Sequence, residues 1–206
     1  FAGAPFTLAS YMIEGGPANH FLKTKAFLYE QPKAWDLLMR KIRKITSEYL
    51  KGQIAAGAQA VQLFDSWVGA LSPEQYRKHV LPHSRWLFDS LRGTGVPTIH
   101  FGTGTSGFLE DFSGAGSDVT GVDWRIDLSA ARRRIGKKQA LQGNLDPVLL
   151  FAPKKVLKLA VHDVLRQGGR RGFIFNLGHG ILPETPVDQV RSVVDWVHDY
   201  AGRKNQ

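Results

Sequence analysis

Cysteine is absent from the 206 residues of this chain. Disulfide bonds, thiolate metal sites and a cysteine nucleophile are therefore excluded within this sequence. The sequence also lacks a run of about eighteen apolar residues, so it predicts no transmembrane helix. Residues 1–5, Phe-Ala-Gly-Ala-Pro, contain neither a positively charged leader nor an initiator methionine. They do not resemble a signal peptide, and we expect the chain to begin inside a longer protein.

Acidic residues are in the minority: 18 Asp and Glu stand against 27 Lys and Arg, which gives a formal net charge of +9. A basic surplus attracts nucleic acid, anionic lipid or a multiply charged small molecule, although a solvated basic surface explains it equally well. The longest basic clusters, at 132–134 with 137–138, at 154–155 and at 170–171, lie between apolar elements. They lack the interleaved aromatic residues of single-strand binders. We therefore expect neither a nucleic-acid partner nor a membrane partner.

Short β-prone runs alternate with helical patterns along the chain. The runs are bounded by Gly, Pro or Asp and are rich in Val, Ile, Leu and Phe, which is typical of strands buried on both faces. Strands are predicted at 60–66, 97–101, 118–123, 139–143 and 172–177, with a strand end at Phe1. Helices are predicted at 33–57, 73–91, 128–135, 154–165 and 187–200.

Start and stop signals refine these helices. Ser72 is the expected N-cap of segment 73–91, with Pro73 in the first helical position. Pro82 within that segment predicts a kink or a break into two helices. Asp127 is the expected cap of segment 128–135.

The alternation of strand and helix predicts an α/β fold with a parallel sheet and right-handed crossovers. Both a doubly wound sheet and a (β/α)8 barrel fit this pattern. The predicted strands are too few to close an eight-stranded barrel. Segment 102–104, Gly-Thr-Gly, is only a fragment of a dinucleotide fingerprint.

The carboxyl ends of the strands are where such folds place their active sites, and His179 lies at one of them. It stands between Gly178 and Gly180, directly after the run 172–177. Flanking glycines let a ligand approach the backbone closely. A histidine there can donate a hydrogen bond to a carboxylate or move a proton. We favour that role over a capping or core role.

Other strand ends carry polar residues with several interpretations. Ser66 follows Asp65, but the Gly-x-Ser-x-Gly elbow of a serine nucleophile is absent. Ser66 is therefore expected to hydrogen-bond a substrate or to form a local cap, and Asp65 to act as a structural acceptor. Asp146 is expected to cap the next element, and Asp123 either supports the site or takes part in the chemistry.

A zinc site is not predicted. His79 and His83 are four residues apart, which places them on one face of a helix. The residues between them do not form the His-Glu-x-x-His pattern. We expect an exposed or packed helix face there.

Four ordered segments resemble the uroporphyrinogen decarboxylase family. They are FAGAPFTL with YMIEG at 1–8 and 11–15, QLFDS at 62–66, LQGNLDP at 141–147 and NLGHG at 176–180. The resemblance covers essentially the whole chain. It implies a (β/α)8 TIM-barrel type of fold, here a partial barrel of about five to six βα units in a single incomplete domain spanning 1–206. It also implies a homodimer in the cytoplasm, or in the plastid of a photosynthetic eukaryote.

The implied activity is that of a carboxy-lyase. The family converts uroporphyrinogen III to coproporphyrinogen III by removing acetate carboxyl groups in haem and chlorophyll biosynthesis. Protonation of a pyrrole carbon makes the ring an electron sink, so no cofactor is implied. A polycarboxylate substrate fits the basic surplus.

By similarity, Tyr11, Ser66 and His179 match family positions that contact the substrate, and Phe1 matches a pocket-lining position. The family's Arg-Gln-Ala-Gly-Arg loop and its pyrrole-binding aspartate belong to an N-terminal part that this chain lacks. No catalytic residue is therefore identified in it, and we expect the isolated chain to be inactive or nearly so.

Two alternatives remain open at the level of sequence. A cobamide-type methyltransferase on the same barrel activates a thiol with zinc held by histidine and cysteine, and the lack of cysteine argues against it. A catalytically inactive tetrapyrrole-binding or interaction module, derived from a truncated homologue, is the alternative from another class.

Overall fold

The computed structural model describes residues 1–16, 18 and 20–202, and the chain divides into two compact units, Phe1–Thr120 and Gly121–Gln206. In this described part, the strands follow the order β1-β2-β3-β4-β5-β6 in one sheet, which is also their order along the chain. The short strand β4 (Val119–Gly121) contains the boundary between the units. The α/β class predicted from the alternating pattern is confirmed. The single-domain interpretation stays a prediction.

The first unit holds three parallel strands, β1 (Ala2–Gly3), β2 (Val61–Asp65) and β3 (Thr98–Gly102). Asp65 lies opposite Gly102 in the register, so β2 and β3 end at the same edge of the sheet. That carboxyl edge is where parallel βα folds place functional groups.

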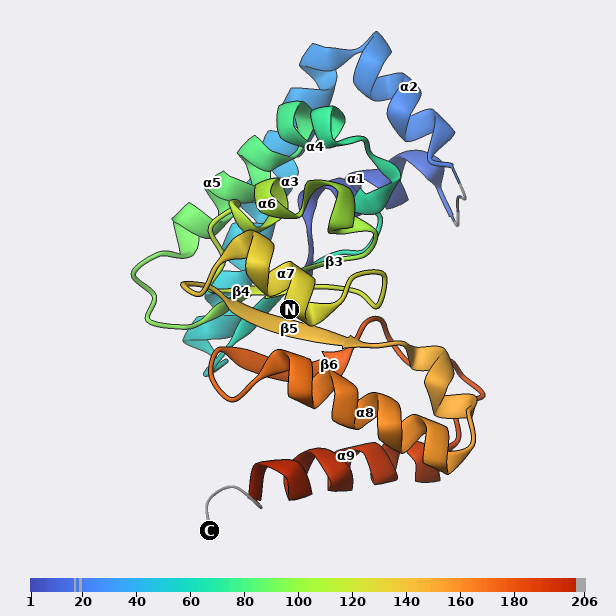
Figure 1. Ribbon diagram of the computed structural model, residues 1–206. Coiled ribbons are helices and arrows are strands. Elements are labelled where there is room, and N and C mark those ends of the chain that lie inside the picture. Colours follow the sequence, from blue (N-terminus) through green and yellow to red (C-terminus); the bar gives the residue numbers. More distant parts are fainter. Residues whose placement is uncertain (17, 19, 203–206) are drawn as a thin grey trace. The chain divides into compact units, whose positions relative to one another are not determined.

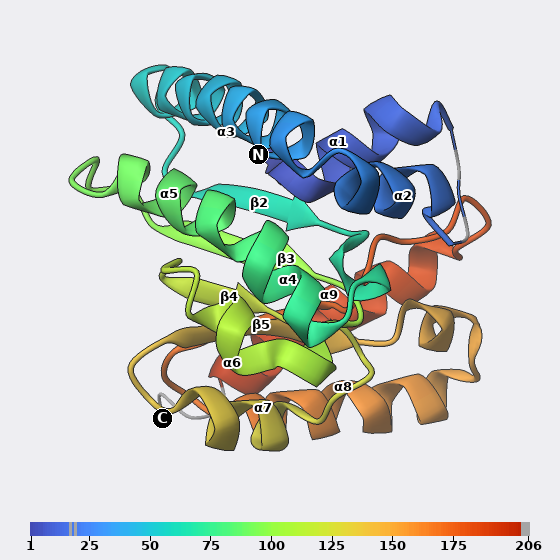
Figure 2. The ribbon, with the colours of Figure 1, turned by 90° about the horizontal axis from the view of Figure 1, so that it is seen from above.

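Helices link and cover these strands (Figure 1). They are α1 (Pro5–Glu14), α2 (Leu22–Glu30), α3 (Pro32–Ala55), α4 (Pro73–His79), α5 (Leu81–Leu91) and α6 (Leu109–Ser113), with short 3-10 helices η1 (Val68–Ala70) and η2 (Thr105–Phe108). Figure 2 shows α3 running alongside α1, which it contacts.

The caps explain where several of these helices begin. The hydroxyl of Ser72 accepts the backbone N–H of Gln75, and the Gln75 side chain accepts the N–H of Ser72, which forms a capping box at α4. The predicted break near Pro82 is confirmed, because α4 ends at His79 and α5 begins at Leu81.

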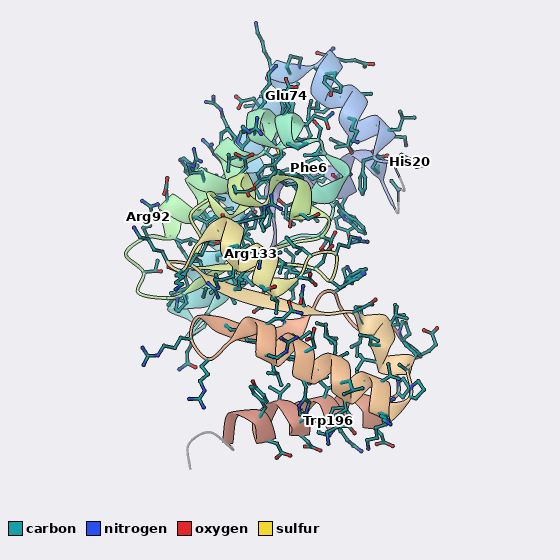
Figure 3. The ribbon with its side chains drawn as sticks, in the orientation of Figure 1. Phe6, His20, Glu74, Arg92, Arg133 and Trp196 are labelled. Carbon is teal, nitrogen blue, oxygen red and sulfur yellow. The ribbon has the colours of Figure 1, made fainter. Side chains whose placement is uncertain are left out.

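Aromatic side chains form the centre of the first unit. Phe6 and Trp35 are fully buried, with ring centroids 6.1 Å apart. The Trp35 indole donates to the His79 carbonyl at 3.1 Å, so its one polar atom is satisfied. Figure 3 shows Phe6 inside this unit, whereas Glu74 and Arg92 lie at its outer surface.

The second unit repeats the βα pattern. Its elements are β5 (Ala140–Leu145), β6 (Phe173–Leu177), α7 (Leu128–Ile135), α8 (Lys154–Gly168), α9 (Val187–Gly202) and η3 (Pro147–Phe151). β5 and β6 are parallel, and α8 and α9 pack side by side (Figure 1). The Arg132 guanidinium donates to the carbonyls of Gln139 and Gly172, where the chain enters β5 and β6. One residue of the basic cluster 132–134 therefore has a structural use.

Two helices and one helix cap differ from what the sequence predicted. Residues 5–14 form α1, whereas only a strand end was predicted near Phe1; the helix begins because Pro5 occupies its first turn. Residues 22–30 form α2, which was not predicted. Asp127 stands at the N-cap of α7, but its side chain makes no capping hydrogen bond, contrary to prediction. Among the described residues, none of the helices is long and apolar enough to cross a membrane.

His83 is buried on α5, whereas His79 is the last residue of α4, so the two histidines do not share one helix as predicted. Its Nδ1 lies 3.4 Å from the Arg43 guanidinium and its Nε2 lies 3.5 Å from an Asp36 carboxylate oxygen. Burial, with a further contribution from the Arg43 charge, lowers the pKa of His83 to about 4. The folded state therefore holds this imidazole neutral at a pH where an exposed histidine is protonated.

Stability should consequently fall on mild acidification. The folded pKa of His83 is lower than the unfolded value of about 6.5, so the unfolded chain binds the extra proton between pH 6.5 and 4. The stabilisation is present above pH 6.5 and is lost as the pH falls towards 4. We expect about 1–2 kcal/mol less unfolding free energy at pH 4.5 than at pH 7 from this group. Urea titrations should show a smaller pH dependence for His83→Gln; parallel curves would contradict this.

Candidate functional site

Tyr11 and Ser66 are connected through Trp67 in the first unit. Tyr11 lies on α1 with 51% of its surface exposed, and its ring meets the Trp67 ring edge-on at a centroid distance of 5.9 Å. Ser66 directly follows β2 and is half-buried. Its carbonyl accepts the Thr103 hydroxyl at 2.5 Å, which ties the end of β2 to the end of β3. Both predicted polar residues therefore lie near Trp67.

Phe1 belongs to a row of aromatic side chains. Its ring meets Phe64 edge-on at 5.4 Å, and Phe64 meets Phe101 at 5.8 Å. Phe64 and Phe101 lie opposite each other in the register of β2 and β3. Phe1 is 74% exposed, whereas Phe64 is half-buried and Phe101 is buried, so Phe1 presents an apolar surface of the kind that binds flat rings and the other two rings lie behind it. Phe64 and Phe101 stand near two strand ends in the sequence, but no role was predicted for them, because their contact with Phe1 depends on the strand register.

A buried polar cluster accompanies Asp65. The Asp65 carboxylate is fully buried and accepts the Thr7 hydroxyl at 3.0 Å. Its second oxygen lies 3.8 Å from Nε2 of the fully buried His100. Burial raises the pKa of Tyr76 well above its ordinary value, and the negative charge of Asp65 acts in the same direction. The interpretation of Asp65 as a structural acceptor fits these contacts.

Glu14 fastens the end of the helix that carries Tyr11. One carboxylate oxygen of Glu14 accepts both the N–H and the hydroxyl of Thr24, at 2.9 and 2.8 Å. The backbone hydrogen bond from Thr24 is the main cause that lowers the pKa of Glu14. α1 and α2 are thus joined by a charge-assisted contact.

In the second unit, the end of β4 leads into a charged turn. Asp123 is buried and accepts both the backbone N–H and the guanidinium of Arg125. The guanidinium also lies over the Trp124 ring, 4.3 Å from its centroid. The Asn144 side chain donates to the carbonyls of Asp123 and Ile126 at 2.9 and 2.6 Å. These bonds join the carboxyl ends of β4 and β5.

His179 is exposed and follows β6 by two residues. Its neighbour Gly178 donates to the Leu145 carbonyl at 2.7 Å. A side chain on Gly178 would lie only 2.7 Å from the backbone nitrogen of Trp124. The glycine before His179 therefore permits a close approach between the ends of β4 and β6. The predicted approach of a ligand stays a prediction.

The predicted site residues form two groups. Phe1, Tyr11 and Ser66 lie in the first unit, and His179 lies in the second. Asp146 has the predicted capping role, because its carboxylate accepts the N–H of Val148 at 2.9 Å. Within the described part of the chain, no group of three or more His, Asp or Glu side chains is placed to hold a metal ion.

Two cavities lie away from these groups. The first, of about 450 Å³, lies at the amino end of β3 and is lined by Arg92, Thr94, Thr98 and Asp118 among others. The second, of about 290 Å³, lies between β6 and α9. Neither is lined by the predicted site residues, so the candidate surface is the carboxyl edge of the strands in each unit.

Comparison with known protein families shows to which family this chain belongs. The family model for uroporphyrinogen decarboxylase (URO-D) matches residues 1–200. The chain belongs to the uroporphyrinogen decarboxylase family. The resemblance drawn from four short segments is thereby confirmed over almost the whole sequence.

Curated uroporphyrinogen decarboxylases are similar along the same length. The chain is 54% identical to that of Carboxydothermus hydrogenoformans, over 97% of this chain and 57% of the relative. It is 55% identical to that of Sorangium cellulosum, over 96% of this chain and 57% of the relative. It is 53% identical to that of Salinispora tropica, over 100% of this chain and 56% of the relative. The chain thus spans a little over half the length of these relatives.

A solved structure shows the fold. A methyltransferase from Methanosarcina mazei superimposes with a TM-score of 0.79, at 22% sequence identity, over 97% of this chain and 58% of that protein. The likeness supports the partial (β/α) barrel class predicted for this uroporphyrinogen decarboxylase family member.

Proposed function

We propose that this protein is a carboxy-lyase that removes the acetate carboxyl groups of uroporphyrinogen III and yields coproporphyrinogen III. The observation that carries the proposal is the family match over residues 1–200, with relatives of that name at 53–55% identity. The exposed Tyr11 on α1, the half-buried Ser66 after β2 and the exposed His179 after β6 support it, since they offer hydrogen-bond donors suited to carboxylates.

This reaction requires the protein mainly to bind the substrate and to stabilise the charge that develops on it. Protonation of a pyrrole carbon turns the ring into an electron sink, the C–C bond to the carboxylate breaks, and carbon dioxide leaves. The electron pair of that bond passes into the protonated ring and leaves an exocyclic methylene group. The methylene carbon takes up a proton and becomes a methyl group, and the ring carbon releases the proton that it first accepted. The pyrrole itself does the work of an electron-withdrawing cofactor. The protein must hold a polycarboxylate and stabilise a positive ring.

The residues of this chain supply part of that environment. In the proposal, Tyr11 donates its hydroxyl near the reacting acetate, and Ser66 and His179 bind carboxylates. Phe1 offers an exposed apolar ring for the macrocycle, and Phe64 and Phe101 pack behind it. The tetrapyrrole is the proposed partner. A homodimer and a cytoplasmic or plastid location remain predictions.

Substitution of the proposed contacts should reduce decarboxylation without unfolding the chain. We expect Tyr11→Phe, Ser66→Ala and His179→Gln each to lower kcat/KM about 10–100-fold, since each removes a hydrogen bond to a charged group. Tyr49→Phe and His162→Gln are matched controls, because both side chains are exposed on helices and lie outside the segments that follow the strands. The readout is the number of carboxyl groups on the product after anaerobic incubation with uroporphyrinogen III.

The assay should be run with the chain alone and with the N-terminal segment of a family member added in trans. Carboxyl loss that requires the added segment would support a decarboxylase whose site is shared with that segment. Loss without it would show that acids of this chain suffice. If a folded chain with the segment produces no loss, the proposal is wrong and the inactive tetrapyrrole-binding module becomes the better interpretation.

A further inference from the structure

Asp65, Thr7 and the backbone N–H of Trp67 form a buried polar relay in the first unit, and none of the proposed substrate contacts belongs to it. The Asp65 carboxylate has 0% of its surface exposed, and the Thr7 hydroxyl donates to its Oδ1. The same hydroxyl oxygen accepts the backbone N–H of Trp67 at 3.3 Å. Thr7 is itself only 4% exposed. Burial of a carboxylate costs free energy, which its hydrogen bond from Thr7 only partly offsets. We therefore ask what function this buried aspartate has.

The other side of Asp65 is also enclosed. Oδ2 makes no hydrogen bond and lies 3.8 Å from Nε2 of His100, which is likewise fully buried. The His100 ring stacks on Phe112 with a centroid distance of 3.8 Å. This stacking fixes His100, and His100 limits the positions open to the Asp65 carboxylate.

We propose that Asp65 is a positioning residue, which acts through the Thr7 hydroxyl and the Trp67 backbone to fix Tyr11 relative to Ser66. Ser66 lies between Asp65 and Trp67 in the chain, so both ends of its turn are held. The fixed Trp67 ring in turn contacts the Tyr11 ring and so limits where Tyr11 can lie. The consequence for catalysis rests on the proposed function; the geometric claim does not.

The hydroxyl of Thr7 is the decisive group because it donates and accepts at once. A methyl group in its place would leave the carboxylate oxygen and the Trp67 N–H without this partner. Thr7 and Trp67 lie on separate elements, α1 and the turn after β2, so the relay fixes one element against the other. Misplacement of a substrate contact by about 1 Å can reduce turnover about 100-fold.

The test compares Thr7→Val, which keeps the size but loses the hydroxyl, with Thr7→Ser, which keeps the hydroxyl. Each chain is labelled with 5-fluorotryptophan, and the Trp67 resonance is assigned from Trp67→Phe. Tyr11→Leu is then introduced into each background to report the ring contact. We expect Tyr11→Leu to shift the Trp67 fluorine signal in the wild type and in Thr7→Ser, and to leave it unmoved in Thr7→Val.

Kinetics of the full-length protein complete the test. We expect kcat to fall about tenfold in Thr7→Val with KM changed less than about twofold, and Thr7→Ser to recover most of the loss. The proposal would be overturned if Tyr11→Leu shifted the Trp67 fluorine signal equally in all three backgrounds. It would also be overturned if Thr7→Val and Thr7→Ser lost kcat equally while they had the same thermal stability. If the wild type shows no decarboxylation, the proposed function fails, and the fluorine comparison still decides the positioning role.

Discussion

Gly178→Ala should destabilise the second unit and impair substrate binding, whereas Gly180→Ala should do neither. A Cβ on Gly178 would lie 2.7 Å from the Trp124 nitrogen and 3.2 Å from the Asp123 carbonyl carbon. These are backbone atoms, so the clash is relieved only if the ends of β4 and β6 separate. Overpacking of this kind costs about 1–3 kcal/mol. The loop that carries His179 should move with it.

Gly180 offers a matched control on the other side of His179. A Cβ there would meet no atom within 4 Å, so its replacement should change the unfolding free energy by less than about 0.5 kcal/mol. Denaturant unfolding measures the stability, and titration of the full-length protein with uroporphyrin measures binding. Equal effects of the two alanines on both quantities would show that the close approach to Trp124 does not position His179.

Phe112→Ala should cost the first unit about 3–5 kcal/mol of unfolding free energy, because the change removes a fully buried ring. The Phe112 ring stacks on His100, and its centroid lies 6.0 Å from that of Tyr76. A Cβ on Gly102 would lie 2.8 Å from the Phe112 ring, which shows how directly the ring packs on β3. Its loss leaves a cavity beside the buried imidazole.

Phe151→Ala is the control for this prediction, because Phe151 is 43% exposed. We expect its replacement to cost about 1 kcal/mol or less. Thermal and denaturant unfolding of the two variants should therefore differ clearly. A cost for Phe112→Ala no larger than that for Phe151→Ala would show that the Phe112 ring is not an essential part of this core.

The sequence by itself determined the order of the strands and of the helices from α3 onwards, apart from the short α6. Each strand run was apolar, short and bounded by turn residues, so its type did not depend on distant contacts. The start of α4 at Pro73 was equally local, because Ser72 and Gln75 complete its capping box within one turn. Four short segments also sufficed to indicate the family that the comparison with residues 1–200 then showed.

Tertiary structure decided the rest. The helix α1 was missed because only a strand end was predicted near Phe1, and the buried face of α1 is defined by its contacts with α3, α2 and β2. Thr7 bonds to Asp65 and Trp67, which lie 58 and 60 positions after it in the chain. The periodicity of a sequence does not predict contacts between residues so far apart in it. The aromatic row from Phe1 to Phe101 likewise depends on the strand register. Local chemistry fixes which elements form, whereas packing fixes which side chains meet.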